Sequence, residues 1–184
     1  MEVKIIDNAL PVQTFELVKR NLFFNSKLNL HVQGEVSGHG IDDENSLDNW
    51  CLYHSFYNEG KPNNDEFYDL LNIFGKFLTF KLNGKTYSHK AIIRIKLNHY
   101  PKTQTLYKHP YHSDTPFDHH SGIYCLNTCD GYTEFEDGTK IDSIENRFYI
   151  FNGSVKHRST TTTCLLYTSP SPRDATLSRM PSSA

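Results

Sequence analysis

The sequence predicts a mainly β domain, an antiparallel barrel or sandwich with two helices packed on its outside. Between residues 80 and 162 of the 184-residue chain, short apolar segments recur at regular intervals and are separated by turns. Before residue 80, two segments instead carry apolar residues at helical spacing. The chain is also rich in aromatic residues, with 11 Tyr and 12 Phe, and its length suits one domain with a sizeable core.

The N-terminal part of the chain supplies the two helices. Residues 2–6 predict a short strand, and a helix is expected to begin near Pro11, because proline fits the first helical turn. Its apolar stripe consists of Val12, Phe15, Val18 and Leu22. Residues 34–49 are polar and predict a loop, whereas residues 50–57 are aromatic and predict a strand or the start of a helix.

A second helix is expected over residues 65–78, after a turn at residues 61–64. Its apolar stripe consists of Phe67, Leu70, Leu71, Phe74 and either Phe77 or Leu78. We assign these aromatic side chains to the core of the domain.

Strands and tight turns follow the second helix. Leu-Asn-Gly-Lys at residues 82–85 is typical of a β-hairpin. Residues 91–100 alternate apolar Ile93, Ile95 and Leu97 with polar side chains, as in a half-buried strand. The further strands are expected at residues 106–114, 123–126, 132–135, 139–142, 147–152 and 156–162.

The composition excludes several classes of function. A net charge of −2 disfavours general affinity for nucleic acid or for anionic membranes. The N-terminus carries charges where a signal peptide needs an apolar core, and no apolar run is long enough to span a membrane. The four cysteines include no CxxC pair, so they indicate neither a disulfide framework nor a zinc site. We therefore expect a reducing, cytoplasmic setting.

The residues with the clearest chemistry are His112 and Asp114, together with His157 further along the chain. Side chains two residues apart on a strand point the same way, so one short strand can offer an imidazole and a carboxylate to one ion. An imidazole from another strand completes two His and one carboxylate, a set that suits non-haem Fe(II). The spacing of the pair alone is a weak signal, because it also fits a polar strand end.

Residues 164–184 do not continue the strand pattern. They are rich in Ser, Pro and Thr and predict a disordered linker or tail. A sharper interpretation is that CLLYTSPSPRDATLSRMPSSA resembles the in-frame translation of a transposase-type sequencing adapter. The native sequence would then end near Thr163, residues 1–163 would form a single domain, and the tail would be non-native.

The segment from residue 97 to residue 162 resembles the Fe(II)- and 2-oxoglutarate-dependent dioxygenases, in particular the prolyl-4-hydroxylase-like branch found in viruses and marine microbes. The resemblance rests on LNHYPKT, YHSD, GIYCLN, GYTEFEDGTKI and FYIFNGSVKHRS. It implies a double-stranded β-helix, a cupin-like jelly roll with its core at about residues 80–163, here truncated at the C-terminus. It also implies Fe(II) held by His112, Asp114 and His157, and hydroxylation of a substrate coupled to conversion of 2-oxoglutarate into succinate and CO₂.

The resemblance also suggests residues that hold the cosubstrate. Asn98 and Tyr100 match an Asn-x-Tyr element that holds 2-oxoglutarate in some family members, although an ordinary strand end before Pro101 explains them equally well. Tyr124 lies where the family lines the cosubstrate pocket. The family's basic anchor on the strand after the second His has no counterpart, because residues 165–167 there are Leu, Leu and Tyr. Loss of such a charge-assisted pair costs about 1.5–3 kcal/mol, so we expect weak binding of 2-oxoglutarate.

Other readings of the sequence stay open. A non-catalytic cupin-like module that binds metal or sugar has the same motif, and a structural viral jelly roll would carry its His by chance. For a hydroxylase, the substrate is a peptide, such as one with a target proline, or a small molecule. His119 and His120 are expected as exposed turn residues, with substrate contact or metal ligation as the alternatives.

Overall fold

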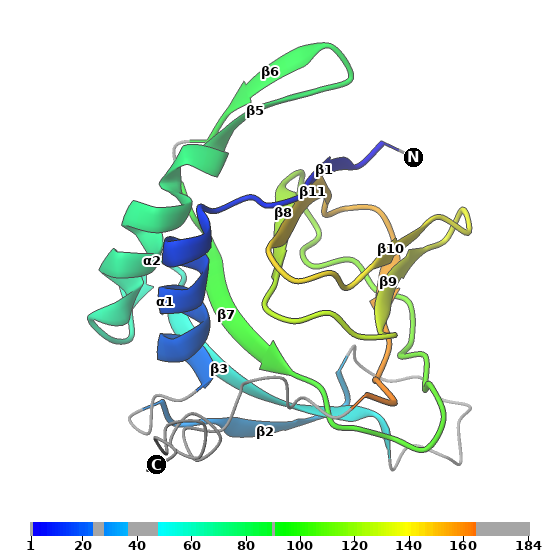
Figure 1. The fold of residues 1–184 in the computed structure, drawn as a ribbon. Coiled ribbons are helices and arrows are strands. Elements are labelled where there is room, and N and C mark those ends of the chain that lie inside the picture. Colours follow the sequence, from blue (N-terminus) through cyan, green and yellow to red (C-terminus); the bar gives the residue numbers. More distant parts are fainter. Residues whose placement is uncertain (1, 24–27, 37–47, 90, 165–184) are drawn as a thin grey trace, which may run out of the picture.

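The computed structural model of the chain describes residues 2–23, 28–36, 48–89 and 91–164, and this part is mainly β, with two α-helices and several antiparallel sheets (Figure 1). In chain order the elements are β1 (Lys4–Ile6), α1 (Val12–Phe23), β2 (His31–Gly34), β3 (Trp50–Asn58), β4 (Lys61–Pro62), α2 (Glu66–Phe74), the 3-10 helix η2 (Gly75–Leu78), β5 (Thr79–Leu82), β6 (Lys85–Ser88), β7 (Arg94–His99), β8 (His120–Cys125), β9 (Tyr132–Phe135), β10 (Lys140–Asp142), β11 (Arg147–Asn152) and β12 (His157–Ser159).

Within the described residues the strands form four groups, and every strand pair is antiparallel. Strand β11 pairs with β1 and β8, and β9 pairs with β10 and β12. The long strand β3 pairs with β2, β4 and β7, with a register shift between Ser55 and Tyr57. Strands β5 and β6 form a hairpin, and Phe80 and Leu82 of β5 are buried in a cluster with Phe148 and Ile150 of β11.

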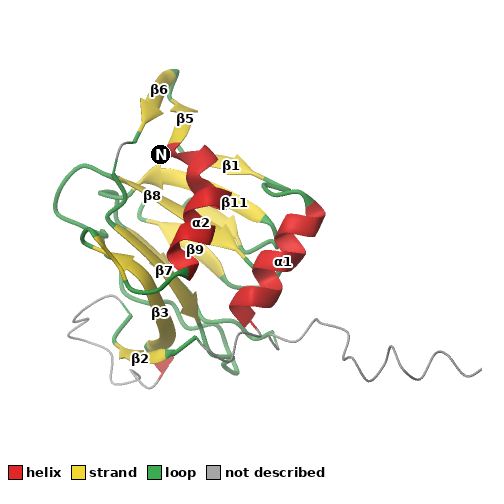
Figure 2. Cartoon of the chain, turned by 90° about the vertical axis from the view of Figure 1, so that its left-hand side faces the viewer, coloured by secondary structure: helices red, strands yellow, loops and turns green. Residues whose placement is uncertain are grey.

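The two helices lie on the outside of the strands, as the sequence predicts (Figure 2). Helix α1 buries Phe15 and Val18, and helix α2 buries Phe67 and Leu70. The side chains of Ile95 and Leu97, on β7, pack against these apolar side chains. Val12 departs from the predicted stripe: it is the first residue of α1 and is 68% exposed.

A second apolar core lies between the β8–β11 and β9–β12 pairs. Its buried members are Cys125, Phe135, Ile141, Tyr149 and Phe151. The Tyr149 hydroxyl is satisfied there, because it lies 2.7 Å from the hydroxyl of buried Thr133. This core forms the wall beneath His157, whose ring lies 4.9 Å from that of Phe151.

The predicted hairpin is confirmed, both in its position in the chain and in the backbone conformation of its turn. Asn83 and Gly84 both have positive φ, 50° and 71°, which a two-residue type I′ turn requires. Residues 50–57, which the sequence left between strand and helix, are part of β3.

The predicted strand over residues 106–114 is wrong. Only isolated bridges occur there, from Lys108 to Thr160 and from His112 to His157. Pro110 has no N–H to offer a ladder and stands between the two bridges, so pairing cannot run through it. The chain stays extended at His112 but turns away from the partner strand by Asp114, which lies in a bend.

Two sequence predictions fall largely outside the described residues: most of the loop at 34–49 and the tail from residue 165 onward. Cys164, the first residue of the predicted tail, is described, and its backbone N–H donates to the Thr162 hydroxyl at 3.0 Å. Within the described chain, neither helix has the length and apolar character needed to cross a membrane.

Candidate metal centre

The backbone holds His112 and His157 opposite one another. Each donates its N–H to the carbonyl of the other, at 2.9 Å from His112 and 2.8 Å from His157. This reciprocal pair fixes the two Cα atoms and points both side chains to the same side. Two histidines that are far apart in the sequence are therefore brought together in one site.

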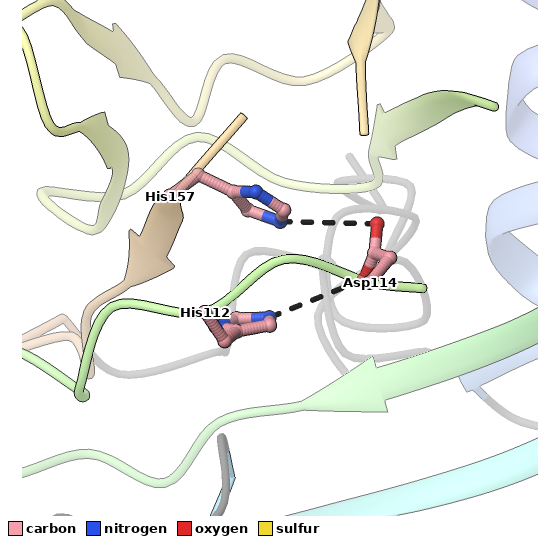
Figure 3. Close-up of side chains that lie close together, drawn as sticks. All are labelled: His112, Asp114 and His157. Carbon is pink, nitrogen blue, oxygen red and sulfur yellow. Dashed lines mark ion pairs between the residues drawn. The ribbon is translucent and has the colours of Figure 1, made fainter. Parts of the chain in front are cut away.

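Hydrogen bonds also orient both imidazole rings. Nδ1 of His157 lies 2.9 Å from the carbonyl oxygen of Val155, and Nδ1 of His112 lies 3.5 Å from that of Pro110. A ring that donates from Nδ1 keeps its lone pair on Nε2. Both Nε2 atoms face Asp114 (Figure 3). Such a carbonyl partner is the usual support of a metal-ligating histidine.

Asp114 completes a three-residue cluster. Its carboxylate oxygens lie 4.0 Å from Nε2 of His112 and 3.8 Å from Nε2 of His157. The three ligand atoms lie within 4.8 Å of one another. These separations are too long for hydrogen bonds. Atoms bound to one ion at about 2.1 Å lie roughly 3 to 4.2 Å apart, so the cluster can hold a metal ion after small side-chain rotations.

Two further side chains hold the carboxylate. The Ser121 hydroxyl donates to one oxygen of Asp114, and Nη2 of Arg94 lies 3.4 Å from the other. Burial alone would raise the pKa of Asp114, but the Ser121 hydrogen bond and the charges of His157 and Arg94 hold that pKa below its ordinary value. The carboxylate is therefore ionised at neutral pH, as a metal ligand must be.

The electrostatics of His112 also suit a ligand. Burial, and then the neighbouring His157, lower the pKa of His112 below its ordinary value. At neutral pH its ring is therefore uncharged, and Nε2 is free to bind a cation. His157 is the most enclosed of the three, with 6% of its side chain exposed.

The structure overturns the expectation that His119 is an exposed turn residue. Its side chain is 8% exposed, and its Nε2 is buried, has no hydrogen-bond partner among the described residues and lies 3.9 Å from Asp114. A Cβ on Gly153 would lie 2.1 Å from that nitrogen, so only glycine leaves room for the ring. His120 is half-buried in β8, and its Nδ1 lies 3.0 Å from Nε2 of His89.

The three expected cosubstrate residues are not brought together. The Asn98 side-chain amide lies 3.4 Å from the Tyr100 hydroxyl, so these two share one side of the chain. Burial raises the pKa of Tyr100 to about 12. Tyr124 instead donates its hydroxyl to the side chain of Asn146 at 2.8 Å and packs against Phe74. Residues alternate in β8, and the face of Tyr124 is opposite to that of Ser121.

Sequence analysis did not identify Arg94 or Ser121 as parts of this site, and it gave His119 a role there only as an alternative. The alternation of polar and apolar residues in β7 could have indicated Arg94, because every second side chain of a half-buried strand points away from the core. Ser121 gave none, because its hydrogen bond to Asp114 depends on how distant segments of the chain come together. Arg158, the residue after His157, points away from the cluster and binds Glu134 at 2.6 Å.

Comparisons with known proteins add no family to this geometry. No family model matches the chain, and no curated protein matches it with significant similarity.

Proposed function

We propose that the protein is an Fe(II)- and 2-oxoglutarate-dependent dioxygenase that hydroxylates a small molecule or a peptide. The observation that carries this proposal is the convergence of His112, Asp114 and His157, with both Nε2 atoms facing one carboxylate. Two neutral imidazoles and one carboxylate reduce the charge of a divalent ion only to +1. They also leave coordination positions open, which is the donor set of non-haem Fe(II) oxygenases.

The donor chemistry fits iron. Within the described residues the cluster offers only imidazole nitrogen and carboxylate oxygen, and it contains no thiolate that would favour a soft metal. When bound, the iron would activate O₂, the oxidant for both the oxidative decarboxylation of 2-oxoglutarate and the hydroxylation of the substrate. The protein supplies geometry: His157 is anchored by Val155, and Asp114 is oriented by Ser121.

The apolar wall beside the cluster supports an oxidative role. The ring of His157 lies 4.9 Å from that of Phe151 and 6.1 Å from that of Phe135, and both phenylalanines are fully buried. This wall keeps water from one flank of the site and raises the strength of its electrostatic interactions.

We also propose that the strands belong to a double-stranded β-helix. The pairing of β8 with β11 and of β9 with β12 gives two antiparallel pairs with a shared apolar core between them. The bridge from His112 to His157 attaches the segment of the first two ligands beside β12. This arrangement supports the jelly roll but also suits other β-sandwiches.

Asn98 and Tyr100 remain our proposed contacts for 2-oxoglutarate. Both are polar, they lie within 3.4 Å of each other, and Tyr100 is close enough to Asp114 for that charge to affect the pKa of its hydroxyl. Tyr124 is not proposed, because its hydroxyl and ring are both engaged on the helix side of β8.

Succinate formation tests the proposal. Purified protein, supplied with Fe(II), ascorbate and 2-oxoglutarate, should release succinate above the rate without iron, and His112→Ala should abolish that release. His31→Ala is the matched control, because His31 is an exposed histidine on β2 and should leave the rate unchanged.

The same preparation separates the alternatives. One tightly bound metal ion per chain, with no succinate formed at millimolar 2-oxoglutarate, would contradict the dioxygenase and favour a cupin-like binding module. Failure to bind any divalent metal would contradict both.

A further inference from the structure

Strand β7 has an apolar face and a cationic face. Ile95 and Leu97 pack against the helices. Arg94 and Lys96 alternate with them and therefore leave the sheet on the opposite side. Neither cation is needed to pack the helices, and both point to the side of the sheet where Asp114 lies.

A groove of about 680 Å³ lies over this cationic face. Strand register explains its lining, because Arg94 is opposite Asn58 and Lys96 is opposite Ser55 across the β3–β7 pair. The neutral polar side chains of Gln33 and Tyr53 also line it. Its charged lining is Lys61, Arg94 and Lys96 against Glu59 alone, so cations are in excess.

The groove adjoins the metal centre through Arg94. Arg94 lines the groove, and its Nη2 lies 3.4 Å from Oδ1 of Asp114. A molecule lying in the groove would therefore have one end near the three metal ligands and the other among cationic and amide groups.

Lys96 lacks an anionic partner in the described part of the chain. Its Nζ lies 3.4 Å from the side-chain oxygen of Gln33 and 5.8 Å from the ring centre of Tyr53, and no described carboxylate forms an ion pair with it. Burial, and then the charge of Arg94, lower the pKa of Lys96. A half-buried ammonium beside a second cation is poorly stabilised, and a bound carboxylate would relieve that cost.

We propose that Arg94 and Lys96 form a binding subsite for a carboxylate group, on a small molecule that occupies the groove and extends to the His112–Asp114–His157 cluster. The identity of that molecule rests on the proposed function, which allows two sources: the distal carboxylate of 2-oxoglutarate, or the carboxylate of an anionic substrate. In the first case the subsite supplies the cation that the family pattern would place after His157.

Succinate binding to the metal-free protein tests the subsite without any assumption about catalysis. Calorimetric titration should show binding of succinate and much weaker binding of the uncharged succinamide. Lys96→Met keeps the length of the side chain and removes its charge, so succinate affinity should fall about 10- to 100-fold. Lys81→Met is the control: Lys81 is exposed on β5, and its loss changes the net charge equally without touching the groove.

A second titration, on Mn(II)-loaded protein, identifies the source. If the subsite holds 2-oxoglutarate, this dicarboxylate binds more tightly than 2-oxobutanoate, and Lys96→Met removes the difference. If it holds the substrate, the two 2-oxo acids bind equally, and succinate binds in the presence of 2-oxobutanoate in a manner that Lys96→Met weakens.

The subsite is refuted if Lys96→Met leaves carboxylate affinity unchanged in both the metal-free and the Mn(II)-loaded protein, with thermal melts showing both variants folded. Loss of succinate formation with carboxylate binding intact would instead contradict the dioxygenase alone.

Discussion

The carboxylates of Glu134 and Asp114 are both surrounded by basic side chains, but these side chains lie closer to Glu134 than most of them lie to Asp114. Glu134 is 8% exposed and accepts hydrogen bonds from Arg158 at 2.6 and 2.8 Å, with Lys108 at 3.4 Å and Lys140 at 3.6 Å. Every positive group there is a permanent cation in direct contact with the carboxylate. The charge of Glu134 is therefore neutralised within the protein.

Asp114 is surrounded differently. Nε2 atoms of His112, His157 and His119 lie 3.8 to 4.0 Å from it, beyond hydrogen-bond distance and with their rings aimed at it. Its direct partners are one hydroxyl, from Ser121, and one cation, Arg94. The comparison shows how a structural ion pair differs from a cluster of metal ligands. In the ion pair the charged groups touch one another, whereas in the cluster the ligand atoms leave space for an ion between them.

The largest effect that separates the two carboxylates is expected from Asp114→Asn. The amide cannot supply an anionic ligand, so Mn(II) affinity should fall by at least about 100-fold, the upper limit for loss of a residue that only supports a ligand. The free energy of unfolding of the metal-free protein should change by less than about 1 kcal/mol, because its ion pair with Arg94 is partly exposed. Calorimetric titration and urea unfolding measure the two quantities.

If Asp114→Asn binds Mn(II) as tightly as the unmodified chain, the carboxylate is not a ligand and the site lies elsewhere.

The opposite pattern is expected from Glu134→Gln. Removing one charge from an enclosed pair leaves Arg158 unpaired and should cost about 2 kcal/mol of unfolding free energy, below the usual cost for a fully buried pair because both lysines are nearly half exposed. Mn(II) affinity should not change. Glu136→Gln is the control, because its pair with Lys156 is about 60% exposed on both sides and is worth less than about 1 kcal/mol.

Equal losses of stability in the two glutamine variants would show that the Glu134 cluster is no more than a surface ion pair.

A smaller effect is expected from Ser121→Ala. The hydroxyl orients Asp114 and lowers its pKa, so its loss should weaken Mn(II) binding about 10-fold without changing the one-to-one stoichiometry. Ser154→Ala removes an exposed hydroxyl that bonds only the carbonyl of Phe117 and should have no effect. Unchanged affinity in Ser121→Ala would remove Ser121 from the site.

The smallest differences should appear with pH. The pKa of Glu134 lies below its ordinary value of 4.5, because Arg158 and Lys108 outweigh the opposing effect of burial. Its contribution to stability is therefore complete above about pH 4.5 and is lost as the pH falls through the lowered value. Metal binding by His112 should decline as the pH falls through the pKa of its imidazole, which lies below the ordinary value of 6.5, because protons then compete with the metal for Nε2.

As the pH falls, the metal affinity should thus decline while the stability difference between the unmodified chain and Glu134→Gln is kept down to about pH 4.5. Loss of both over the same pH interval would contradict the assignment of separate roles.

Much of this arrangement follows from sequence pattern. Helical spacing places Phe15 and Val18 in α1, and the Asn-Gly pair at residues 83 and 84 determines a hairpin, because these signals are local. The convergence of His112, Asp114 and His157 was also predicted, because two imidazoles and one carboxylate suit one chemistry and the family resemblance adds His157 to the weak signal of the pair.

What could not be predicted depends on pairing between distant strands. Pro110 breaks the expected strand before Asp114, and the side chains that hold Asp114 come from β7 and β8, whose register no local pattern determines. Tyr124 was assigned to the cosubstrate pocket on the family resemblance alone. Its position in the chain is close to Ser121, but strand alternation puts its ring on the helix side.

The most direct test of the metal centre is the ¹⁵N spectrum of the histidine rings during addition of Zn(II), a diamagnetic ion that can occupy the same ligands. The structure predicts that the Nε2 signals of His112 and His157 shift together at one equivalent while their Nδ1 signals stay in the hydrogen-bonded state, and that exposed His31 does not respond. Zinc-dependent shifts in only one of the two rings, or at Nδ1, would contradict the cluster as the place where metal binds.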